Sequence, residues 1–143
     1  MFDIRFISDE PEIDDEGRVT LLGEVTLGDE SERFLASLSI WTRENYEQQW
    51  RDAAQRLLDG HDRTAFFTSA FGMWWQMWHD GGDVRVQEQL LLSERFALLP
   101  QPLDLERTPY ELIEEYQRTT EDGEAISEWR LTFRDIERFV RGW

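Results

Sequence analysis

Residues 70–82 read AFGMWWQMWHDGG and place three tryptophans within five positions. Two periodicities fit these aromatic residues. In a helix, Trp74, Trp75 and Trp78 would share one face, because they fall at helical spacing. In a strand, Trp74 and Trp78 would share one face and Trp75 would lie on the other. The choice between the two decides whether the middle of the chain belongs to a sheet.

The glycines around this stretch favour the strand. Gly72 and Gly81 leave only eight residues between them, which is short for a helix. Residues 80–83 read DGGD, a hairpin turn signal, and lead into the run VRVQEQLLL at residues 84–92. Large aromatic residues dominate sheet cores, so we expect the tryptophans to be core. An exposed platform for stacking or for anchoring a partner is the alternative.

Alternation of apolar and polar residues predicts strands elsewhere in the chain. The pattern is clearest in VTLLGEVTL at residues 19–27, which the turn residues GDES follow at 28–31. Residues 9–17 (DEPEIDDEG) contain a proline and a run of acids, so we expect a charged loop there. The other predicted strands are residues 2–6, 34–40, 64–70 and 125–133.

One long amphipathic helix is predicted at residues 43–58. Thr42 suits the N-cap position, and Gly60 suits the C-terminal end. Tyr46 and Trp50 begin an apolar stripe at helical spacing, and charged residues occupy the opposite face. We therefore expect this helix to pack on the sheet through Trp50.

These elements together predict one α+β domain over residues 1–143. Its centre is a mainly antiparallel sheet of about six to seven strands, with the 43–58 helix packed on it. Shorter C-terminal helices follow, one opening at Thr108-Pro109 and running through Tyr116, the other at residues 134–141. The expected core residues of this fold are Tyr46, Trp50, Trp75 and Trp129.

Composition limits the classes of function. The chain carries 31 acidic and 15 basic residues, a formal charge of -16. Such a field repels phosphate backbones and anionic membranes and attracts basic proteins. The chain has no cysteine, which excludes disulfides and zinc–thiolate sites. Without a signal sequence or a long apolar run, we expect a cytoplasmic protein that binds neither nucleic acid nor membrane.

Motifs of known catalytic families are absent from the sequence. Two His-Asp pairs, His61-Asp62 and His79-Asp80, leave a small metal-dependent hydrolase as the alternative function. Such a site would need further ligands, and the chain has no third histidine. We therefore expect a protein that is not an enzyme and that holds neither a metal nor another cofactor.

Acidic residues gather in three clusters along the chain. Each cluster is either a solvated face or a surface complementary to a basic partner, whose on-rate and specificity it would raise. A DNA mimic or scaffold that binds basic proteins indiscriminately is a weaker alternative. The candidate contact residues are Asp14, Asp15, Glu16, Glu111, Glu114, Glu115, Glu121 and Asp122.

Several short segments share their order with a known family. They are the Y-x-x-x-W spacing of Tyr46 and Trp50, Thr68-Ser69 at a strand end, Q-x-Q-L at residues 87–90, and ISEW at 126–129 followed by Asp135-Ile136. In this arrangement the chain, from about residue 20 onward, resembles the immunity proteins of bacterial contact-dependent growth inhibition systems, the CdiI family.

The resemblance implies a function in binding and not in catalysis. Members of this family are cytoplasmic antitoxins that bind the C-terminal toxin domain of a cognate exported toxin and neutralise it. The toxins are often nucleases and therefore basic, which agrees with the acidic composition. The shared residues look like determinants of the fold, so the resemblance locates no interface.

Overall fold

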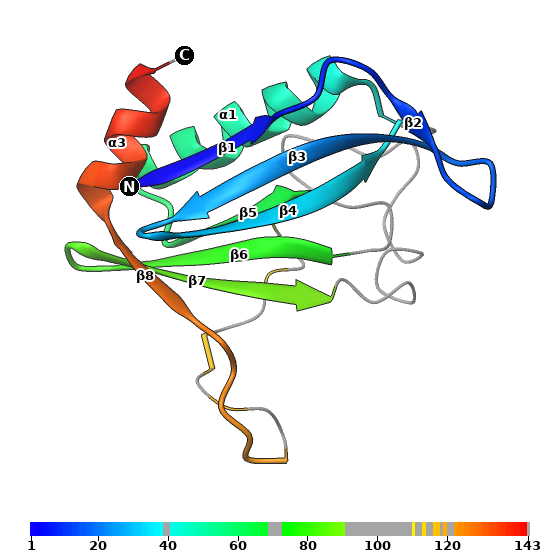
Figure 1. The fold of residues 1–143 in the computed structure, drawn as a ribbon. Coiled ribbons are helices and arrows are strands. Elements are labelled where there is room, and N and C mark those ends of the chain that lie inside the picture. The colour runs from blue at the N-terminus through cyan, green and yellow to red at the C-terminus, as the bar shows by residue number, and fades with distance from the viewer. Residues whose placement is uncertain are drawn as a thin grey trace.

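The computed structural model describes residues 1–38, 41–68, 73–90 and 122–142, together with Tyr110, Ile113, Tyr116, Gln117 and Thr119. This part of the chain forms two four-stranded sheets, whose strands all pair antiparallel, and two helices (Figure 1). The strands are β1 (Phe2–Phe6), β2 (Glu12–Ile13), β3 (Val19–Leu27), β4 (Glu30–Ser37), β5 (Arg63–Phe67), β6 (Met73–Asp80), β7 (Asp83–Leu90) and β8 (Trp129–Thr132). The helices are α1 (Arg43–Leu58) and α3 (Phe133–Arg141). The predicted α+β class is confirmed.

The first sheet is built around β3. Strands β1 and β2 pair with one side of β3, and β4 pairs with the other side over the full length of β4. Gly23 of β3 pairs with Phe6 of the neighbouring strand β1 and with Phe34 of the neighbouring strand β4. Side chains alternate between buried and exposed along β1 and β3, as expected for a sheet with one face on the core.

The second sheet has the order β5-β6-β7-β8 and contains the tryptophan stretch. Residues 73–80 form β6, so the prediction of a strand is confirmed. Strands β6 and β7 form the predicted hairpin, and Gly81 takes φ +64°, which favours glycine at that position of the turn. Trp74, Trp75 and Trp78 are all buried. They therefore serve the core and offer no stacking platform.

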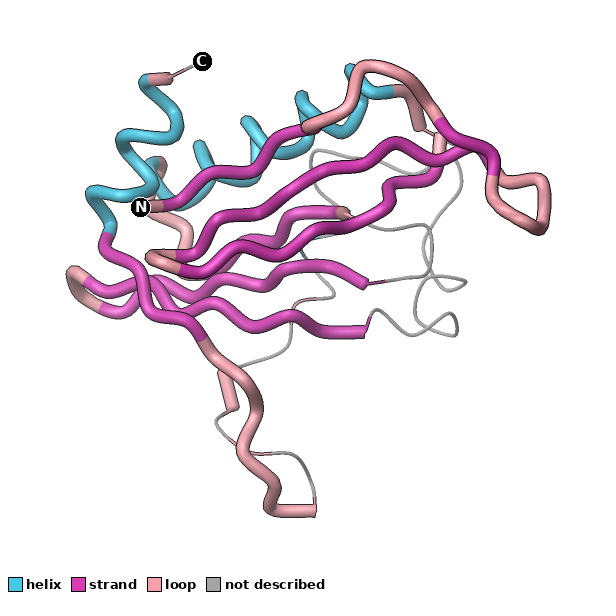
Figure 2. The backbone as a smooth tube through the Cα atoms, viewed as in Figure 1, coloured by secondary structure: helices cyan, strands magenta, loops and turns pink. Residues whose placement is uncertain are grey.

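Helix α1 spans the predicted residues 43–58. Thr42 is its N-cap: the Thr42 hydroxyl accepts a hydrogen bond from the Asn45 N–H, and the Asn45 side chain accepts one from the Thr42 N–H. Gly60 follows the last turn with φ +101°. Figure 2 shows both helices on the same side of the strands. No helix in the described ranges is long and apolar enough to cross a membrane.

Hydrogen bonds from side chains to backbone carbonyls, in both directions, join α1 to β5 and fix the helix on the second sheet. The Trp50 indole N–H donates to the Phe67 carbonyl over 2.7 Å, and the Gln49 amide donates to the Ala65 carbonyl over 2.8 Å. The Thr64 hydroxyl donates to the Ala53 carbonyl over 2.8 Å. Because every one of these groups is buried, each needs its partner.

The core joins both sheets and both helices through aromatic contacts. The rings of Phe2 in β1 and Phe66 in β5 lie 5.3 Å apart, and Phe2 and Phe139 of α3 lie 5.0 Å apart. Tyr46, Trp50 and Trp75, three of the expected core residues, are buried. The fourth, Trp129, is partly buried and packs on Trp75 with ring centroids 5.2 Å apart.

The described part of the segment predicted as a helix from Thr108 packs on both α1 and the second sheet. Tyr110 is buried beside α1, where the Gln49 amide donates to its hydroxyl over 3.3 Å and the Arg56 guanidinium lies 4.0 Å from its ring centroid. Ile113 is also buried, and the Tyr116 ring lies 5.6 Å from Trp78 of β6. The Arg85 guanidinium donates to the Tyr116 hydroxyl over 2.8 Å. The prediction that this helix runs through Tyr116 is wrong, because Tyr110 lies in a 3-10 turn and neither Ile113 nor Tyr116 is helical. The remaining residues of that predicted helix lie outside the described ranges.

Three local expectations need correction. The charged loop at residues 9–17 contains the short strand β2, because Glu12 and Ile13 pair with the start of β3. The strand expected at residues 125–133 is reduced to β8, with Ala125 in an isolated bridge to Thr119. Phe133 begins α3, because Thr132 and Asp135 form a capping box that ends the strand.

The expected sheet of six to seven strands is divided between two sheets. The division falls at α1, which carries the chain from β4 of the first sheet to β5 of the second. Alternation shows that a segment is a strand but does not show which strand it pairs with. The ends of the strands predicted at 34–40, 64–70 and 84–92 fall partly on residues that lie outside the described ranges.

Candidate functional site

The two His-Asp pairs lie close together in the structure, because the His79 N–H donates to the Asp62 carbonyl over 2.8 Å. The His79 ring is stacked on Phe133, with centroids 4.7 Å apart, while His61 is exposed. Within the described ranges no group of three or more His, Asp or Glu side chains could hold a metal ion. The arrangement therefore gives the alternative of a metal-dependent hydrolase no support.

The first acidic cluster lies on the hairpin between β2 and β3, where Asp14 organises the turn. One carboxylate oxygen of Asp14 accepts hydrogen bonds from the Glu16 N–H at 2.9 Å and the Arg18 N–H at 2.8 Å. The other oxygen accepts from Arg18 Nε at 2.8 Å. The hydrogen bond from the Arg18 backbone N–H is the main cause that lowers the pKa of Asp14 below 3.8. Asp14 therefore stabilises the turn of the hairpin.

Asp15 and Glu16 at the tip of this hairpin are exposed. Glu16 lies 3.2 Å from Arg18, an ion pair on the surface. Pairs of this kind contribute little to stability, typically about 0–1 kcal/mol. Unlike Asp14, these two carboxylates are therefore available to a partner at little cost to the fold.

The structure describes little of the other two acidic clusters. Glu111, Glu114, Glu115 and Glu121 lie outside the described ranges. Asp122 is exposed at a turn before β8. Whether any of these residues contacts a partner stays a prediction from the sequence.

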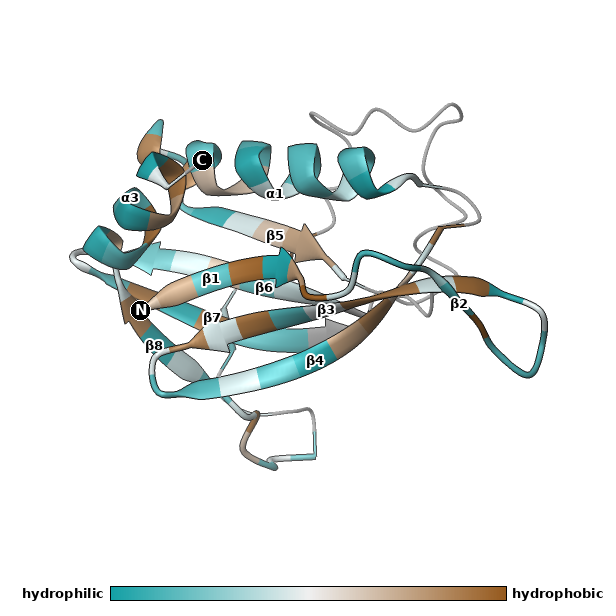
Figure 3. Cartoon of the chain, turned by 45° about the horizontal axis from the view of Figure 1, so that its top comes forward, coloured by the Kyte–Doolittle hydropathy of each residue, from teal (hydrophilic) through white to brown (hydrophobic). Residues whose placement is uncertain are grey.

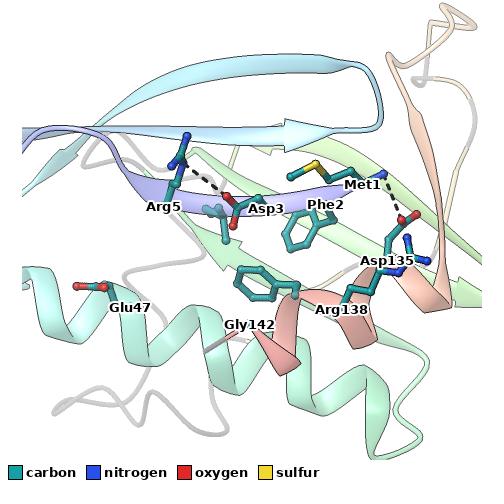
Figure 4. A pocket seen from close by; sticks show the side chains of 10 residues that line it. Met1, Phe2, Asp3, Arg5, Glu47, Asp135, Arg138 and Gly142 are labelled. Carbon is teal, nitrogen blue, oxygen red and sulfur yellow. Dashed lines mark ion pairs between the residues drawn. The ribbon is translucent and has the colours of Figure 1, made fainter.

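A pocket of about 560 Å³ lies between β1, α1 and α3 (Figure 4). Phe2, Ile4 and Phe139 provide its apolar lining. Two ion pairs lie on its rim: the Met1 ammonium is 3.1 Å from Asp135, and Arg5 Nε is 3.5 Å from Asp3 (Figure 4). The first of these pairs ties the start of β1 to α3.

Asp135 joins this ion pair to the cap of α3. Desolvation alone would raise its pKa, but the hydrogen bonds from Thr132 and the Met1 ammonium outweigh it and hold the pKa below 3.8. The Asp135 carboxylate therefore stabilises the fold by capping α3 and by pairing with the Met1 ammonium. The pocket results from the packing of three elements and brings together no further reactive group.

Exposed apolar side chains gather at one end of the first sheet, a feature that the sequence analysis missed. Of the five large hydrophobic residues that are exposed in the described chain, four lie there. They are Ile7, Ile13, Val19 and Leu35, with exposed fractions of 36%, 74%, 37% and 43%. Ile13, which lies within the acidic run at residues 9–17, was the signal available in the sequence. A sequence pattern does not show which strand residues stay exposed to solvent in the fold.

Comparisons with known proteins agree with the resemblance found in the sequence. Residues 36–139 match the CdiI N-terminal domain family. The fold is similar to that of a chain in the CdiA-CT/CdiI toxin and immunity complex from Enterobacter cloacae, with a TM-score of 0.83. The two chains are 21% identical, and the likeness covers 99% of this chain and 97% of the other. No curated protein sequence matches the chain.

At 21% identity, the fold likeness shows a shared architecture alone. The family match covers most of the chain, and the matched residues include α1, the tryptophan strand β6 and the whole second sheet. The family consists of immunity proteins and not of enzymes, as expected from the absence of catalytic motifs. The chain belongs to the CdiI family of contact-dependent growth inhibition immunity proteins.

Proposed function

We propose that this protein binds the C-terminal toxin domain of its cognate contact-dependent growth inhibition toxin and thereby neutralises it. The observation that carries the proposal is the family match over residues 36–139. The fold likeness to a chain of a toxin and immunity complex supports it. Binding alone suffices for such a function, so no catalytic group is required.

The charge of the chain supports a basic toxin domain as the partner. A formal charge of -16 raises the rate at which a basic protein is captured and disfavours acidic partners. Enzymes that act on nucleic acids need cationic surfaces for the phosphate backbone. We therefore propose a nuclease as the toxin, neutralised in the cytoplasm by an acidic protein that covers its active site.

Co-expression tests this proposal. The reading frame immediately upstream, limited to its C-terminal domain, is expressed in a host with and without this protein. We expect the domain to stop growth when expressed alone and to be harmless and co-purify when both are present. A domain that stops growth regardless, or that is harmless on its own, would overturn the proposed function.

The nature of the toxin is tested with the purified domain. We expect it to degrade DNA or RNA, and we expect an equimolar amount of this protein to stop the cleavage. A domain that inhibits growth without cleaving either nucleic acid would contradict the nuclease part of the proposal while leaving neutralisation by binding intact.

A further inference from the structure

Strand β4 forms the outer border of the first sheet (Figure 3). Among the strands in the described ranges it pairs with β3 alone, over residues 30–37. Residues 30–33 and Leu35 are exposed, whereas Val25 and Leu27 of the neighbouring β3 are buried. An exposed edge strand presents backbone N–H and C=O groups to which another strand can bind.

Two hydrogen bonds near the end of β4 show which of its backbone groups face away from β3. The Leu38 N–H donates to the Val19 carbonyl of β3 over 2.9 Å. The Ser37 carbonyl faces the other way and accepts from the Tyr46 hydroxyl over 2.8 Å. Backbone groups alternate in direction along a strand, and the register with β3 is uninterrupted. The exposed residues of β4 whose N–H and C=O groups face away from β3 are therefore Ser31, Arg33 and Leu35.

These three residues define the open edge of β4, residues 31–35, and its side chains disfavour pairing between two copies of the chain. A two-fold pairing centred on Glu32 or on Arg33 would place like charges directly opposite each other, which is destabilising. The formal charge of -16 adds repulsion between the copies. The open edge is therefore better suited to a strand that carries cations.

Carboxylates from both sheets lie beside the open edge. The Trp129 indole N–H donates to the Glu30 carboxylate over 2.6 Å and brings the start of β4 to β8. Trp129 is the cross-strand partner of Val86 in β7, and Glu88 lies two positions further along the same face of β7. Glu32 follows Glu30 in the same way on β4. The Glu32 and Glu88 carboxylates therefore face the same junction between the two sheets.

The charge of Glu32 is felt at Glu88. Partial burial is the main cause that raises the pKa of Glu88, and the negative charge of Glu32 raises it further. The two carboxylates thus repel each other when both are ionised. A cation placed beside them would remove this repulsion, so the junction is complementary to a Lys or Arg side chain of a partner.

We infer that the open edge of β4 pairs with an extended strand of the basic toxin domain. This inference rests on the proposed function and adds the place and the mode of contact. The backbone of the added strand hydrogen-bonds to the outward groups of β4, and its Lys or Arg side chains meet Glu32 and Glu88. In this mode of recognition, backbone hydrogen bonds provide affinity and side chains provide specificity.

The test compares Arg33→Pro with Arg33→Ala for binding to the purified toxin domain by calorimetry. Both variants remove the same cation, but only proline also removes the outward N–H. Proline is tolerated on an edge strand where the missing N–H faces solvent, so the fold should be retained. We expect Arg33→Pro to raise the dissociation constant at least about tenfold above that of Arg33→Ala.

A second variant, Glu32→Gln, removes one carboxylate and leaves the backbone of the open edge intact. We expect it to weaken binding several-fold and to reduce the dependence of the affinity on salt. Its matched control is Glu44→Gln, which removes an exposed carboxylate in the first turn of α1. We expect this control to change the dissociation constant less.

Circular dichroism and the thermal midpoint of each variant check the fold, and sedimentation of the unmodified protein measures its oligomeric state. If folded Arg33→Pro binds as tightly as Arg33→Ala, the inference is wrong. If Arg33→Pro does not fold, an effect of Glu32→Gln no larger than that of Glu44→Gln overturns the inference. A dimer of the unmodified protein that Arg33→Pro dissociates would also overturn it, because a second copy would then occupy the edge. If the unmodified protein itself does not bind the domain, the proposed function fails instead.

Discussion

Gly23 of β3 lies directly beneath the ring of Phe34, its cross-strand partner in β4. A β-carbon built at position 23 would overlap Cζ and Cε2 of that ring. The ring has little room to move, because its centroid lies 5.9 Å from Trp50 and 6.3 Å from Phe6. The glycine is thus required by packing, and its φ is not positive.

Gly23→Ala should therefore destabilise the protein by about 1–3 kcal/mol, as overpacking of a core does. Urea denaturation followed by circular dichroism measures the change. Gly82→Ala is the control, since no atom lies within 4 Å of a β-carbon at that position and its φ is not positive. An equal effect of both substitutions would show that the contact with Phe34 is not the cause.

Trp50→Phe should destabilise the fold more than Trp129→Phe. Trp50 is fully buried, and its indole N–H donates to the Phe67 carbonyl, so the substitution leaves a cavity and an unpaired buried carbonyl. We expect a loss of roughly 2–4 kcal/mol. Trp129 donates to the Glu30 carboxylate over 2.6 Å but is only partly buried. Chemical denaturation of both variants measures the loss in free energy of unfolding. Equal losses would contradict the importance of the bond from Trp50 in α1 to Phe67 in β5.

Alkaline pH should destabilise the fold through two tyrosines. Burial raises the pKa of Tyr46 and of Tyr110 from 10.0 to about 12 each. Because the unfolded chain ionises first, their contribution to stability is complete below pH 10 and is lost as the pH rises through 12. Urea midpoints across this range, with tyrosinate absorbance as a second signal, measure the effect. Tyr46→Phe should flatten the dependence, and a flat profile in the unmodified protein would contradict the prediction.

Acid should weaken the β2–β3 hairpin through Asp14. The hydrogen bond from the Arg18 backbone N–H is the main cause of its lowered pKa, so its contribution to stability is present above pH 3.8 and is lost as the pH falls through the lowered value. Asp14→Asn should therefore be less stable than the unmodified protein at neutral pH, and the two should converge at low pH. Unfolding curves at several pH values measure this. A difference that is independent of pH would contradict it.

Charge reversal should distinguish the two ends of β3 in toxin binding. Asp15→Arg places a cation at the tip of the β2–β3 hairpin, and Asp29→Arg makes the same charge change at the turn between β3 and β4. We expect Asp29→Arg, which lies beside the exposed start of β4, to slow association several-fold and to weaken its salt dependence. Asp15→Arg should change both quantities less. Stopped-flow association at two salt concentrations measures both, and equal effects would place the contact elsewhere.

The strands, the main helix and its cap were predictable because they depend on neighbouring residues. Thr42 and Asn45 lie three positions apart, so their reciprocal hydrogen bonds need only one helical turn. The alternation in residues 19–27 and the glycines around the tryptophans act over equally short ranges. The net charge of -16 is likewise a property of composition.

The tertiary structure decided which surfaces these elements leave open. Asp14 is an acid like Asp15 in the sequence, but only the folded hairpin assigns one to the turn and leaves the other exposed. Ile13 and Leu35 are 22 positions apart, and β3 brings them to one end of a sheet. Hydrogen bonding and periodicity along consecutive residues determined the secondary structure. Strand pairing and exposure depend on distant residues, and these decided which side chains the fold buries and which it leaves exposed.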